Sequence, residues 1–508
     1  MTSPLPVAIL GAGASGLAAA LELVSREENL HLFEAHSLPG GCASWFRRSS
    51  PIGSLQFDVG ATVLDGLSSG TWLADRLGQW GVELSPFRRM PRIFFKLRRA
   101  ESAFSLSTRT VDEWLRDLKK AFPEDSRFID EDLGHLARLA AGLKSLVEAR
   151  PHFPIQTFGD LRRNLRLLPR VPGVAASLLA CGHFDFETWL DARPRSQKLT
   201  EWMTMNLLIT VQCAPEKIYT PWAALALSFY PLGAGTLPGG MRGLMEPALR
   251  ALMKNPLARV SLNERVLEIS KDGHGFWIRS RRGDATPTQS GPFRAVVSGL
   301  TRFDTALIAP ESAFVSRESE WENHEGEIWG ACTAYVALND DDAWPADAFN
   351  VHSKLAEGPG HEGNDAYLSF SARNDLSRAP EAYRVVTIST HTRVKIWQSL
   401  DKTQYQHLKD ERGARLLEHL ESWSERSRDS FAHVEFGTPR SFERYTHRRA
   451  GHVGGLPMTR DNTLLDPAPQ RSRLAGLYQI GDTSFPGQSV YACLLGAVAA
   501  VEKLESET

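Results

Sequence analysis

Paired cysteines, long hydrophobic runs and an excess of one charge are all missing from this chain. Its five cysteines lie far apart and form no Cys-x-x-Cys pair, and an odd number cannot close into a complete set of disulfides. A reducing cytoplasm is therefore the simplest setting for the protein. No apolar run reaches the ~18–20 residues that a membrane-spanning helix needs. The N-terminus lacks the basic and apolar regions of a secretory signal.

Charge and composition exclude further classes of protein. The 58 lysines and arginines are balanced by 60 aspartates and glutamates, which leaves a net charge of −2 and argues against a dedicated nucleic-acid-binding protein. Hydrophobic residues make up 42% and charged residues 23% of the 508 residues, as in a globular protein and unlike a disordered chain. No set of residues has the spacing of a metal site. We expect neither nucleic acid nor a metal as a partner.

The strongest pattern lies near the N-terminus. Val7–Leu10 predicts a short strand, the next six residues read Gly-Ala-Gly-Ala-Ser-Gly, and residues 17–24 predict a helix. Leu30–Phe33 predicts a second strand that ends at Glu34. A strand, a Gly-x-Gly-x-x-Gly turn, a helix, a strand and an acid within about 30 residues are typical of a dinucleotide-binding unit.

Each residue of this turn has a physical task. Gly11 permits the tight turn, Gly13 lets the backbone approach a pyrophosphate, and Gly16 lets the helix pack closely on the strand. Ala14 and Ser15 stand at the helix N-terminus, which offers free N–H groups and the positive end of the helix dipole to phosphates.

The acid at the end of the second strand disfavours NADP and leaves FAD and NAD as alternatives. Glu34 can accept hydrogen bonds from an adenosine ribose, and its charge would repel the 2′-phosphate of NADP. The chain has one complete Gly-x-Gly-x-x-Gly fingerprint of a dinucleotide-binding unit. Enzymes that reduce a flavin with NAD(P)H often carry a second fingerprint, so direct turnover of a pyridine nucleotide is disfavoured.

The C-terminal end predicts a further strand, turn and helix. Residues 476–480 alternate like a strand and lead into Gly481 and Asp482, and an alanine-rich helix follows from Ser489. The Asp482 carboxylate can bind ribityl or pyrophosphate-side hydroxyls, and the helix N-terminus can stabilise negative charge at the N1 edge of a flavin. Alternatively, this segment is a final strand–helix unit that packs on the sheet without a role in binding.

Several motifs together resemble the phytoene desaturase superfamily of FAD-dependent oxidoreductases. They are residues 7–16, Glu34, residues 39–41, residues 57–60, residues 238–241 and residues 481–488. The Gly-Asp-x-x-Phe-Pro-Gly-Gln ending is most similar to the branch of carotenoid isomerases, carotenoid 3,4-desaturases and retinol saturases. The resemblance is loose over residues 80–200 and 303–440. It departs at Cys42, where many relatives carry Arg or Ser.

The resemblance implies FAD as the cofactor. It implies that the loop with the paired glycines passes under the flavin and that Val266 contacts the adenine; from the sequence alone, Val266 is only a buried strand residue. The residues that we expect to bind FAD are Gly11, Gly13, Ala14, Ser15, Gly16, Glu34, Ala35, Gly40, Gly41, Gly60, Ala61, Thr62, Val266, Gly481, Asp482, Gln488, Ser489 and Val490. The sequence identifies no catalytic residue.

We predict an α/β fold in which a Rossmann-type FAD-binding domain, glutathione-reductase-like or amine-oxidase-like, is interleaved with an α+β substrate domain. The FAD-binding domain is discontinuous and comprises residues 1–75, 235–301 and 441–508. Residues 76–234 and 302–440 form the substrate-facing or membrane-facing domain. In the middle segment we expect a helix over residues 244–253 and one strand over residues 260–269, paired with residues 276–280.

Two basic segments allow more than one interpretation. The segment that starts at Leu161 and ends at Val171 alternates four arginines with leucines. It is either a peripheral contact with anionic lipid headgroups on the cytoplasmic face of a membrane or a solvated amphipathic helix packed on the domain. The run His447-Arg448-Arg449, with His452, lacks a complete ligand set for a metal. We interpret these residues as solvated or phosphate-facing.

The resemblance implies an FAD-dependent oxidoreductase that acts on a long hydrophobic polyene by desaturation or cis–trans isomerisation. The electrons pass to oxygen or a quinone, or return to the substrate. One alternative is a saturase or an oxidase of another hydrophobic or amine substrate. A second is a non-catalytic protein that binds and escorts polyenes.

Overall fold

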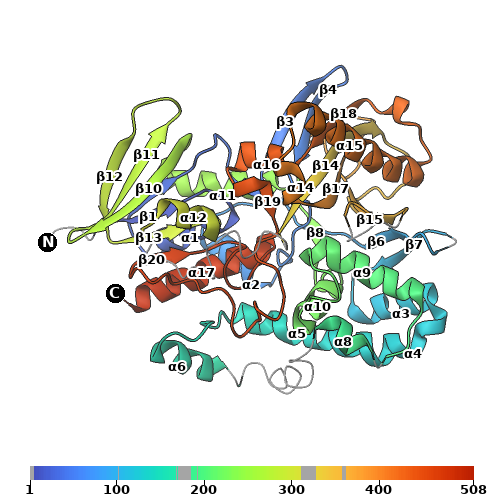
Figure 1. The fold of residues 1–508 in the computed structure, drawn as a ribbon, viewed down its shortest axis with the longest axis horizontal. Coiled ribbons are helices and arrows are strands. Elements are labelled where there is room, and N and C mark those ends of the chain that lie inside the picture. Colours follow the sequence, from blue (N-terminus) through green and yellow to red (C-terminus); the bar gives the residue numbers. More distant parts are fainter. Residues whose placement is uncertain are drawn as a thin grey trace.

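A five-stranded parallel sheet gathers segments from the start, the middle and the end of the chain (Figure 1). The computed structural model describes residues 5–100, 102–167, 169, 185–191, 193–310, 328–356 and 362–507. In spatial order, the strands are β20 (Leu477–Gln479), β13 (Ala295–Ser298), β1 (Val7–Leu10), β2 (Leu30–Phe33) and β9 (Ala258–Ser261). β1, β2 and β13 are buried along their whole length, as expected for parallel strands covered on both faces.

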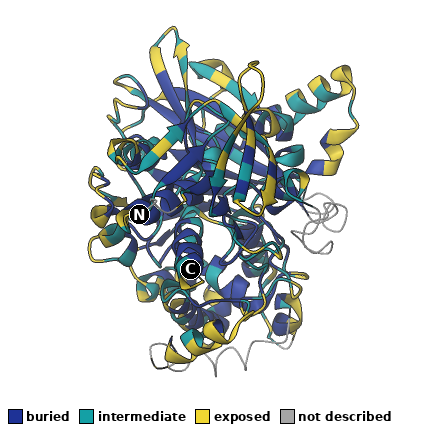
Figure 2. Ribbon diagram, turned by 90° about the vertical axis from the view of Figure 1, so that its left-hand side faces the viewer, coloured by how far each residue is buried: buried dark blue, intermediate teal, exposed yellow. Residues whose placement is uncertain are grey.

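Three helices close the core of this sheet. α1 (Ala14–Ser25) packs against both α17 (Val490–Ser506) and α11 (Arg242–Lys254). Their leucine, alanine and valine side chains join those of the strands in one buried cluster. Figure 2 shows buried residues along the strands and the facing helices, with exposed residues at the periphery. The predicted α/β fold class and the predicted strand–helix–strand unit at the N-terminus are confirmed.

The single strand expected over residues 260–269 is wrong, because the chain breaks there into two strands. β9 ends at Ser261, and β10 (Glu264–Asp272) begins a separate antiparallel sheet with β11 (Gly275–Arg282) and β12 (Thr288–Phe293). Asn263, with a φ of +58°, turns the chain between them. Asparagine tolerates this left-handed conformation better than most residues. The expected pairing of residues 276–280 with this segment is confirmed for β10.

A second, eight-stranded sheet lies beside the parallel sheet (Figure 1). Its strands are β18 (His433–Gly437), β14 (Trp329–Asn339), β17 (Tyr383–Arg393), β16 (Asp365–Phe370), β15 (Phe349–Lys354), β6 (Arg92–Lys96) and β7 (Phe104–Ser107), with β19 (His452–Val453) paired to β14. Both predicted insert segments therefore contribute strands to one sheet. β19 belongs to the segment that we assigned to the FAD-binding domain, and the domain boundaries stay a prediction.

Helices cover the second sheet and fill the space below it in the view of Figure 1. α15 (Lys402–Ser424) packs on β14, β17 and β18, and α5 (Gly134–Glu148) packs on α10 (Thr220–Leu227). The other helices are α2 (Trp72–Gln79), α3 (Val111–Ala121), α4 (Ser126–Phe128), α6 (Phe158–Leu167), α8 (Phe186–Asp191), α9 (Gln197–Val211), α12 (Arg302–Ile308), α14 (Val394–Gln398) and α16 (Pro439–Thr446). The remaining short strands form two two-stranded antiparallel sheets: the hairpin of β3 (Trp45–Ser50) and β4 (Gly53–Asp58), and the pair of β5 (Arg88–Arg89) and β8 (Gly235–Thr236).

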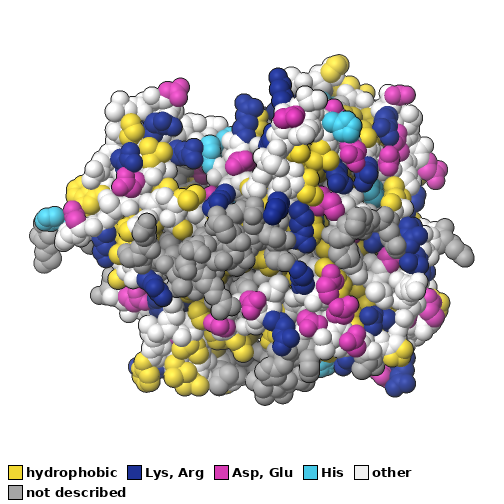
Figure 3. Space-filling view, viewed as in Figure 1, with side chains coloured by type: hydrophobic (Ala, Val, Ile, Leu, Met, Phe, Trp, Pro, Cys, Tyr) yellow, Lys and Arg dark blue, Asp and Glu magenta, His cyan; other side chains and the backbone are white. Residues whose placement is uncertain are grey.

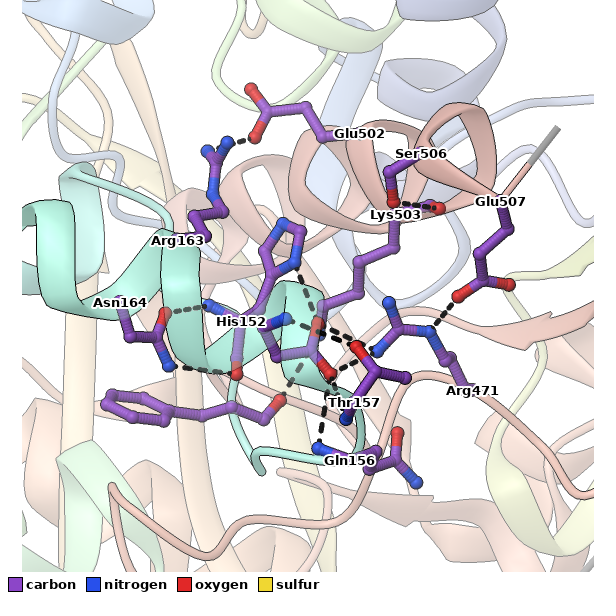
Figure 4. A network of polar contacts seen from close by, with 12 residues as sticks. His152, Gln156, Thr157, Arg163, Asn164, Arg471, Glu502, Lys503, Ser506 and Glu507 are labelled. Atoms are coloured by element: carbon purple, nitrogen blue, oxygen red, sulfur yellow. Dashed lines mark hydrogen bonds and ion pairs between the residues drawn. The ribbon is translucent and has the colours of Figure 1, made fainter.

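One face of α6 is fastened to the rest of the molecule by polar contacts (Figure 4). The buried Asp160 accepts hydrogen bonds from Arg471 Nη1 at 2.8 and 3.0 Å, and its Oδ1 lies 2.9 Å from His152 Nδ1. One turn later, Arg163 donates to Glu502 of α17 at 2.5 Å. Because Asp160 and Arg163 lie three residues apart, they share a helix face, and that face points into the protein.

The opposite face of α6 is apolar and exposed. Phe158 is 80%, Leu165 56% and Leu161 39% exposed, and Ile155 just before the helix is 49% exposed. Hydrophobic side chains gather over this region at the lower left of Figure 3. Leu161 and Leu165 therefore do not pack on the domain, whereas Leu167 at the end of the helix is buried. Residues 168, 170–171 and 174–179 of the same basic and apolar stretch lie outside the described residues.

No helix within the described ranges is both long and apolar enough to cross a membrane.

A buried ion pair links the start of the chain to the second sheet. Asp58, at the end of β4, has no exposed side-chain surface; its Oδ2 lies 3.0 Å from Nη2 of the buried Arg378, and its Oδ1 accepts from the Met241 N–H at 2.9 Å. We expect Arg378→Gln to lower the free energy of unfolding by about 3–5 kcal/mol, because it leaves a buried carboxylate without its counter-charge. Chemical denaturation measures this change.

The matched control is Arg127→Gln. Arg127 pairs with Glu131 at 3.1 Å, but both side chains are largely exposed, so solvent already screens the pair. We expect a nearly unchanged unfolding midpoint. Equal losses in the two variants would contradict the assigned role of burial.

Candidate functional site

A cavity of about 1270 Å³ extends from the carboxyl ends of the parallel strands into the space beside the second sheet. Ligands of open α/β sheets bind outside these strand ends. All the residues that we expect to bind FAD line this cavity except Gly16. Gly16 lies behind the wall, where a Cβ atom would come within 1.9 Å of the Gly11 carbonyl oxygen. The cavity therefore brings together positions from both ends and the middle of the chain.

The glycine-rich turn and the paired glycines form one continuous part of the wall. Gly13 and Gly40 form an isolated parallel bridge, and the Gly40 N–H donates to the Ala12 carbonyl at 2.8 Å. Gly11 and Gly40 have φ values of +88° and +107°, which residues with a side chain rarely adopt. No side chain caps the N-terminus of α1. Its first N–H groups are therefore available to an anion.

Two backbone N–H groups hold Glu34 rigidly beside this turn. Oε2 accepts from the Ala12 N–H at 2.6 Å, and Oε1 accepts from the His36 N–H at 2.7 Å. Burial raises the pKa of the Glu34 carboxyl and outweighs these hydrogen bonds, which lower it. A carboxylate has about four lone-pair sites, so both oxygens can still accept from the hydroxyls of a ribose.

Val266 lines the cavity near Glu34. The backbone N–H of Glu264 donates to the Glu34 carbonyl at 2.8 Å, and Val266 follows two residues later in β10. Its side chain is half-buried in the structure, where the sequence alone indicates a buried strand residue. The break at Asn263 turns this strand across the cavity wall instead of continuing the parallel sheet.

Asp482 is not free in the wall but is paired with Arg448. Arg448 Nη2 donates to both carboxylate oxygens, at 2.6 and 2.7 Å, and Nη1 donates to Cys42 Sγ at 3.1 Å. Burial alone would raise the pKa of Asp482, but the adjacent guanidinium outweighs burial and lowers it. Of the two interpretations of Arg448, the solvated one is wrong, because its side chain is only 12% exposed, and the phosphate-facing one stays a prediction. No local pattern reveals a partner that is 34 residues away.

The C-terminal turn and helix complete this part of the wall. Ser489 caps α17 by accepting from the Ala492 N–H at 3.0 Å. Gln488 donates to the Thr210 carbonyl of α9 at 2.7 Å and so ties the turn to the helical layer. The predicted helix from Ser489 is confirmed as α17. Its N-terminus faces the same cavity as that of α1.

The far end of the cavity is lined by aromatic and apolar side chains, which the sequence did not identify as a group. They include Trp222, Phe229 and Met458. Two tyrosines add polar atoms: the hydroxyl of Tyr230 lies 2.9 Å from Nε2 of the fully buried His352, and Tyr367 is also buried. Burial raises the pKa of both tyrosines and lowers that of His352 to about 3. These groups are therefore neutral at physiological pH.

Within the described part of the chain, no group of three or more His, Cys, Asp or Glu side chains is arranged to hold a metal ion. The four cysteines at positions 42, 213, 332 and 493 are free thiols.

Comparisons with known proteins agree with this geometry. The family model described as flavin containing amine oxidoreductase matches residues 14–504. Prolycopene isomerase of Arabidopsis thaliana is 23% identical over 98% of this chain and 82% of its own length. A 4,4′-diapophytoene desaturase of Staphylococcus aureus is 22% identical over 98% of each chain. The resemblance to carotenoid-modifying flavoenzymes is thus confirmed.

Solved structures show the same fold at low sequence identity. Cyclohexylamine oxidase from Brevibacterium oxydans aligns with a TM-score of 0.61 and 14% identity over 99% of this chain and all of that chain. An oxidoreductase from Methanosarcina mazei aligns with a TM-score of 0.61 and 14% identity over 98% of this chain and all of that chain. Together with the family match, these structures confirm FAD as the cofactor. The contacts of single residues with FAD stay a prediction.

The packing of Gly16 gives a direct test of this turn. We expect Gly16→Ala to lower the melting temperature and the FAD bound per chain, because the added Cβ would overlap the Gly11 carbonyl and push α1 away from the turn. Absorbance of the purified protein measures bound flavin.

Gly78→Ala in α2 is the matched control, since a Cβ there meets nothing within 4 Å. Alanine is favoured over glycine in a helix by roughly 0.5–1 kcal/mol, so this variant should keep its flavin and its stability. Normal flavin content in Gly16→Ala would show that the turn tolerates a side chain.

Proposed function

Because the chain belongs to the flavin-containing amine oxidoreductase family, we propose that it is an FAD-dependent oxidoreductase that desaturates or isomerises a long conjugated polyene. The observation that carries this proposal is the cavity, which extends from the glycine-rich turn to a space lined by apolar and aromatic side chains. The names of the relatives, prolycopene isomerase and 4,4′-diapophytoene desaturase, agree with it. The binding residues deduced from the sequence are part of the proposal.

The residues of the groove fit FAD. The N-terminus of α1 and the loop at Gly40 and Gly41 suit the pyrophosphate, Glu34 suits the adenosine ribose, and Val266 suits the adenine. The N-terminus of α17 suits a group that becomes negative during the reaction. FAD supplies the exchange of a hydride or single electrons with the substrate, while the protein orients both and excludes water.

The far end of the cavity favours a polyene over an amine. A cationic amine is bound by an unpaired carboxylate or by the faces of a cage of neutral aromatic rings. Asp65, a carboxylate of the cavity wall, is already paired with Lys144 at 3.0 Å. Tyr230 and Tyr367 are buried in the wall. Apolar and aromatic groups around them match a long hydrocarbon chain.

A peripheral membrane contact accompanies this substrate. α6 presents Phe158, Leu161 and Leu165 to solvent next to the exposed Arg162 and Arg166. Apolar residues beside arginines suit the interface of an anionic bilayer, in which a polyene dissolves. Because the inner face of α6 is held by ion pairs, the helix can insert without unfolding. We assign the protein to the cytoplasmic face of such a membrane.

The reaction is tested with FAD-loaded protein and vesicles that contain a poly-cis C40 polyene, without oxygen and with chemically reduced flavin. Isomerisation predicts a more trans product, by chromatography, without net flavin oxidation. Desaturation predicts a longer chromophore when oxidised protein is given oxygen or a quinone. The FAD-depleted protein is the control.

Other outcomes support the alternatives. Stoichiometric flavin oxidation with a shorter chromophore would indicate a saturase. A shifted polyene spectrum with unchanged composition would indicate an escort protein. Turnover of amines but not of polyenes would overturn the proposal.

The membrane contact is tested by sedimentation with anionic vesicles. We expect Leu161→Ser with Leu165→Ser to weaken vesicle binding by about tenfold or more, because each buried leucine contributes about 1.5–3 kcal/mol. Met253→Ser with Leu376→Ser is the control, since these exposed residues lie outside α6. Equal binding of both variants would contradict the contact.

A further inference from the structure

Arg448 bridges two segments on either side of the N-terminus of α1. Its Nη1 donates to Sγ of Cys42, directly after the paired glycines, and its Nη2 donates to Asp482, directly after Gly481. Both segments touch the glycine-rich turn. Gly40 bridges Gly13, and a Cβ at Gly481 would lie 3.4 Å from Ser15 Oγ. The guanidinium thus stands beside the turn that suits the pyrophosphate.

The backbone around Arg448 holds it in this place. α16 ends at Thr446, and the chain reverses at the next residue, His447, which has a φ of +56°. Gly451 completes the reversal with a φ of +65°, and a Cβ there would come within 1.8 Å of the Pro439 carbonyl oxygen. A tight turn closed by glycine leaves the arginine little freedom to move away.

Donor capacity remains on this side chain. A guanidinium has five N–H donors, and the contacts with Cys42 and Asp482 use only Nη1 and Nη2. Nε is buried without a hydrogen-bond partner among the described residues. The Arg448–Asp482 pair has no net charge, whereas a pyrophosphate brings two negative charges into the cavity. A planar, partly used guanidinium is well suited to bind phosphate oxygens.

We propose that Arg448 is a cofactor-binding residue that donates hydrogen bonds to the pyrophosphate of FAD, with Cys42 and Asp482 orienting its guanidinium. This inference rests on the proposed position of FAD along the glycine-rich turn. It assigns to residue 448 a role beyond that of a structural partner for Asp482. A purely structural Arg448 would affect stability but not the affinity of the folded protein for the cofactor.

The experiment measures the affinity of the FAD-depleted protein for FAD by flavin fluorescence, and for ADP by competition. ADP keeps both phosphates but lacks the ribityl chain and the flavin ring. We expect Arg448→Gln to weaken the binding of FAD and of ADP by a similar factor. The loss of affinity should be about 10- to 100-fold, which is usual for a charge-assisted hydrogen bond. Arg448→Lys keeps the positive charge but loses the planar set of guanidinium donors. Its affinity for FAD and ADP should lie between those of Arg448→Gln and the native protein.

Arg378→Gln is the matched control, because it also breaks a buried arginine–aspartate pair while Arg378 does not line the cavity. It should lose stability yet bind both ligands normally. If Arg448→Gln does not fold, the comparison rests on Arg448→Lys, for which a loss of FAD and ADP affinity is expected.

Three results would overturn or redirect the inference. Unchanged affinities in folded Arg448 variants would overturn it. A loss of affinity for FAD but not for ADP would also overturn the assignment to the pyrophosphate, since it would place Arg448 at the ribityl chain or the flavin ring. If the native protein fails to bind FAD at all, the proposed function itself fails, and this outcome is distinct from the other two.

Discussion

The contact between the first turn of α1 and the turn after β1 is the constraint on which the site depends. Gly16 leaves no room for a Cβ atom against the Gly11 carbonyl, so α1 starts directly at the carboxyl end of the central strand. Its uncapped N–H groups then face the cavity. The paired-glycine loop, the Glu34 carboxylate and the Gly481–Asp482 turn all lie against the glycine-rich turn or the first residues of this helix. A shift of this helix would therefore displace every polar group of the groove together.

Three charged groups of the cavity wall have partners in the protein itself. Backbone N–H groups hold Glu34, Arg448 pairs with Asp482, and Lys144 pairs with Asp65. Because a charge removed from water is costly unless it is paired or hydrogen-bonded, these partners keep the wall stable before any ligand binds. The same pairing leaves the far end neutral and mostly apolar. The two ends of one cavity thus differ in polarity, as binding a dinucleotide beside a hydrocarbon requires.

In α6, paired charges rather than most of the apolar side chains face the protein. Asp160 and Arg163 point inward, where they meet Arg471 and Glu502 (Figure 4), while Phe158, Leu161 and Leu165 are exposed. A helix pattern read from the sequence gives its two faces but not which face is buried. Here the ion pairs with α17 and the segment before it decide the orientation, and they come from more than 300 positions away.

The sequence by itself determined the parts whose signal is local. The turn from Gly11 to Gly16, the two short strands and Glu34 lie within one stretch, so their glycine spacing and hydrophobic runs predicted a dinucleotide-binding unit. The sharp motif at Gly481–Asp482 likewise predicted the last strand and helix. Only the tertiary structure decided the rest. The break at Asn263 interrupts a continuous strand-like pattern, and the positions of Arg448 and of Tyr230 depend on partners distant in the chain. Side-chain pairing across such separations follows from how the two sheets pack, which no local periodicity records.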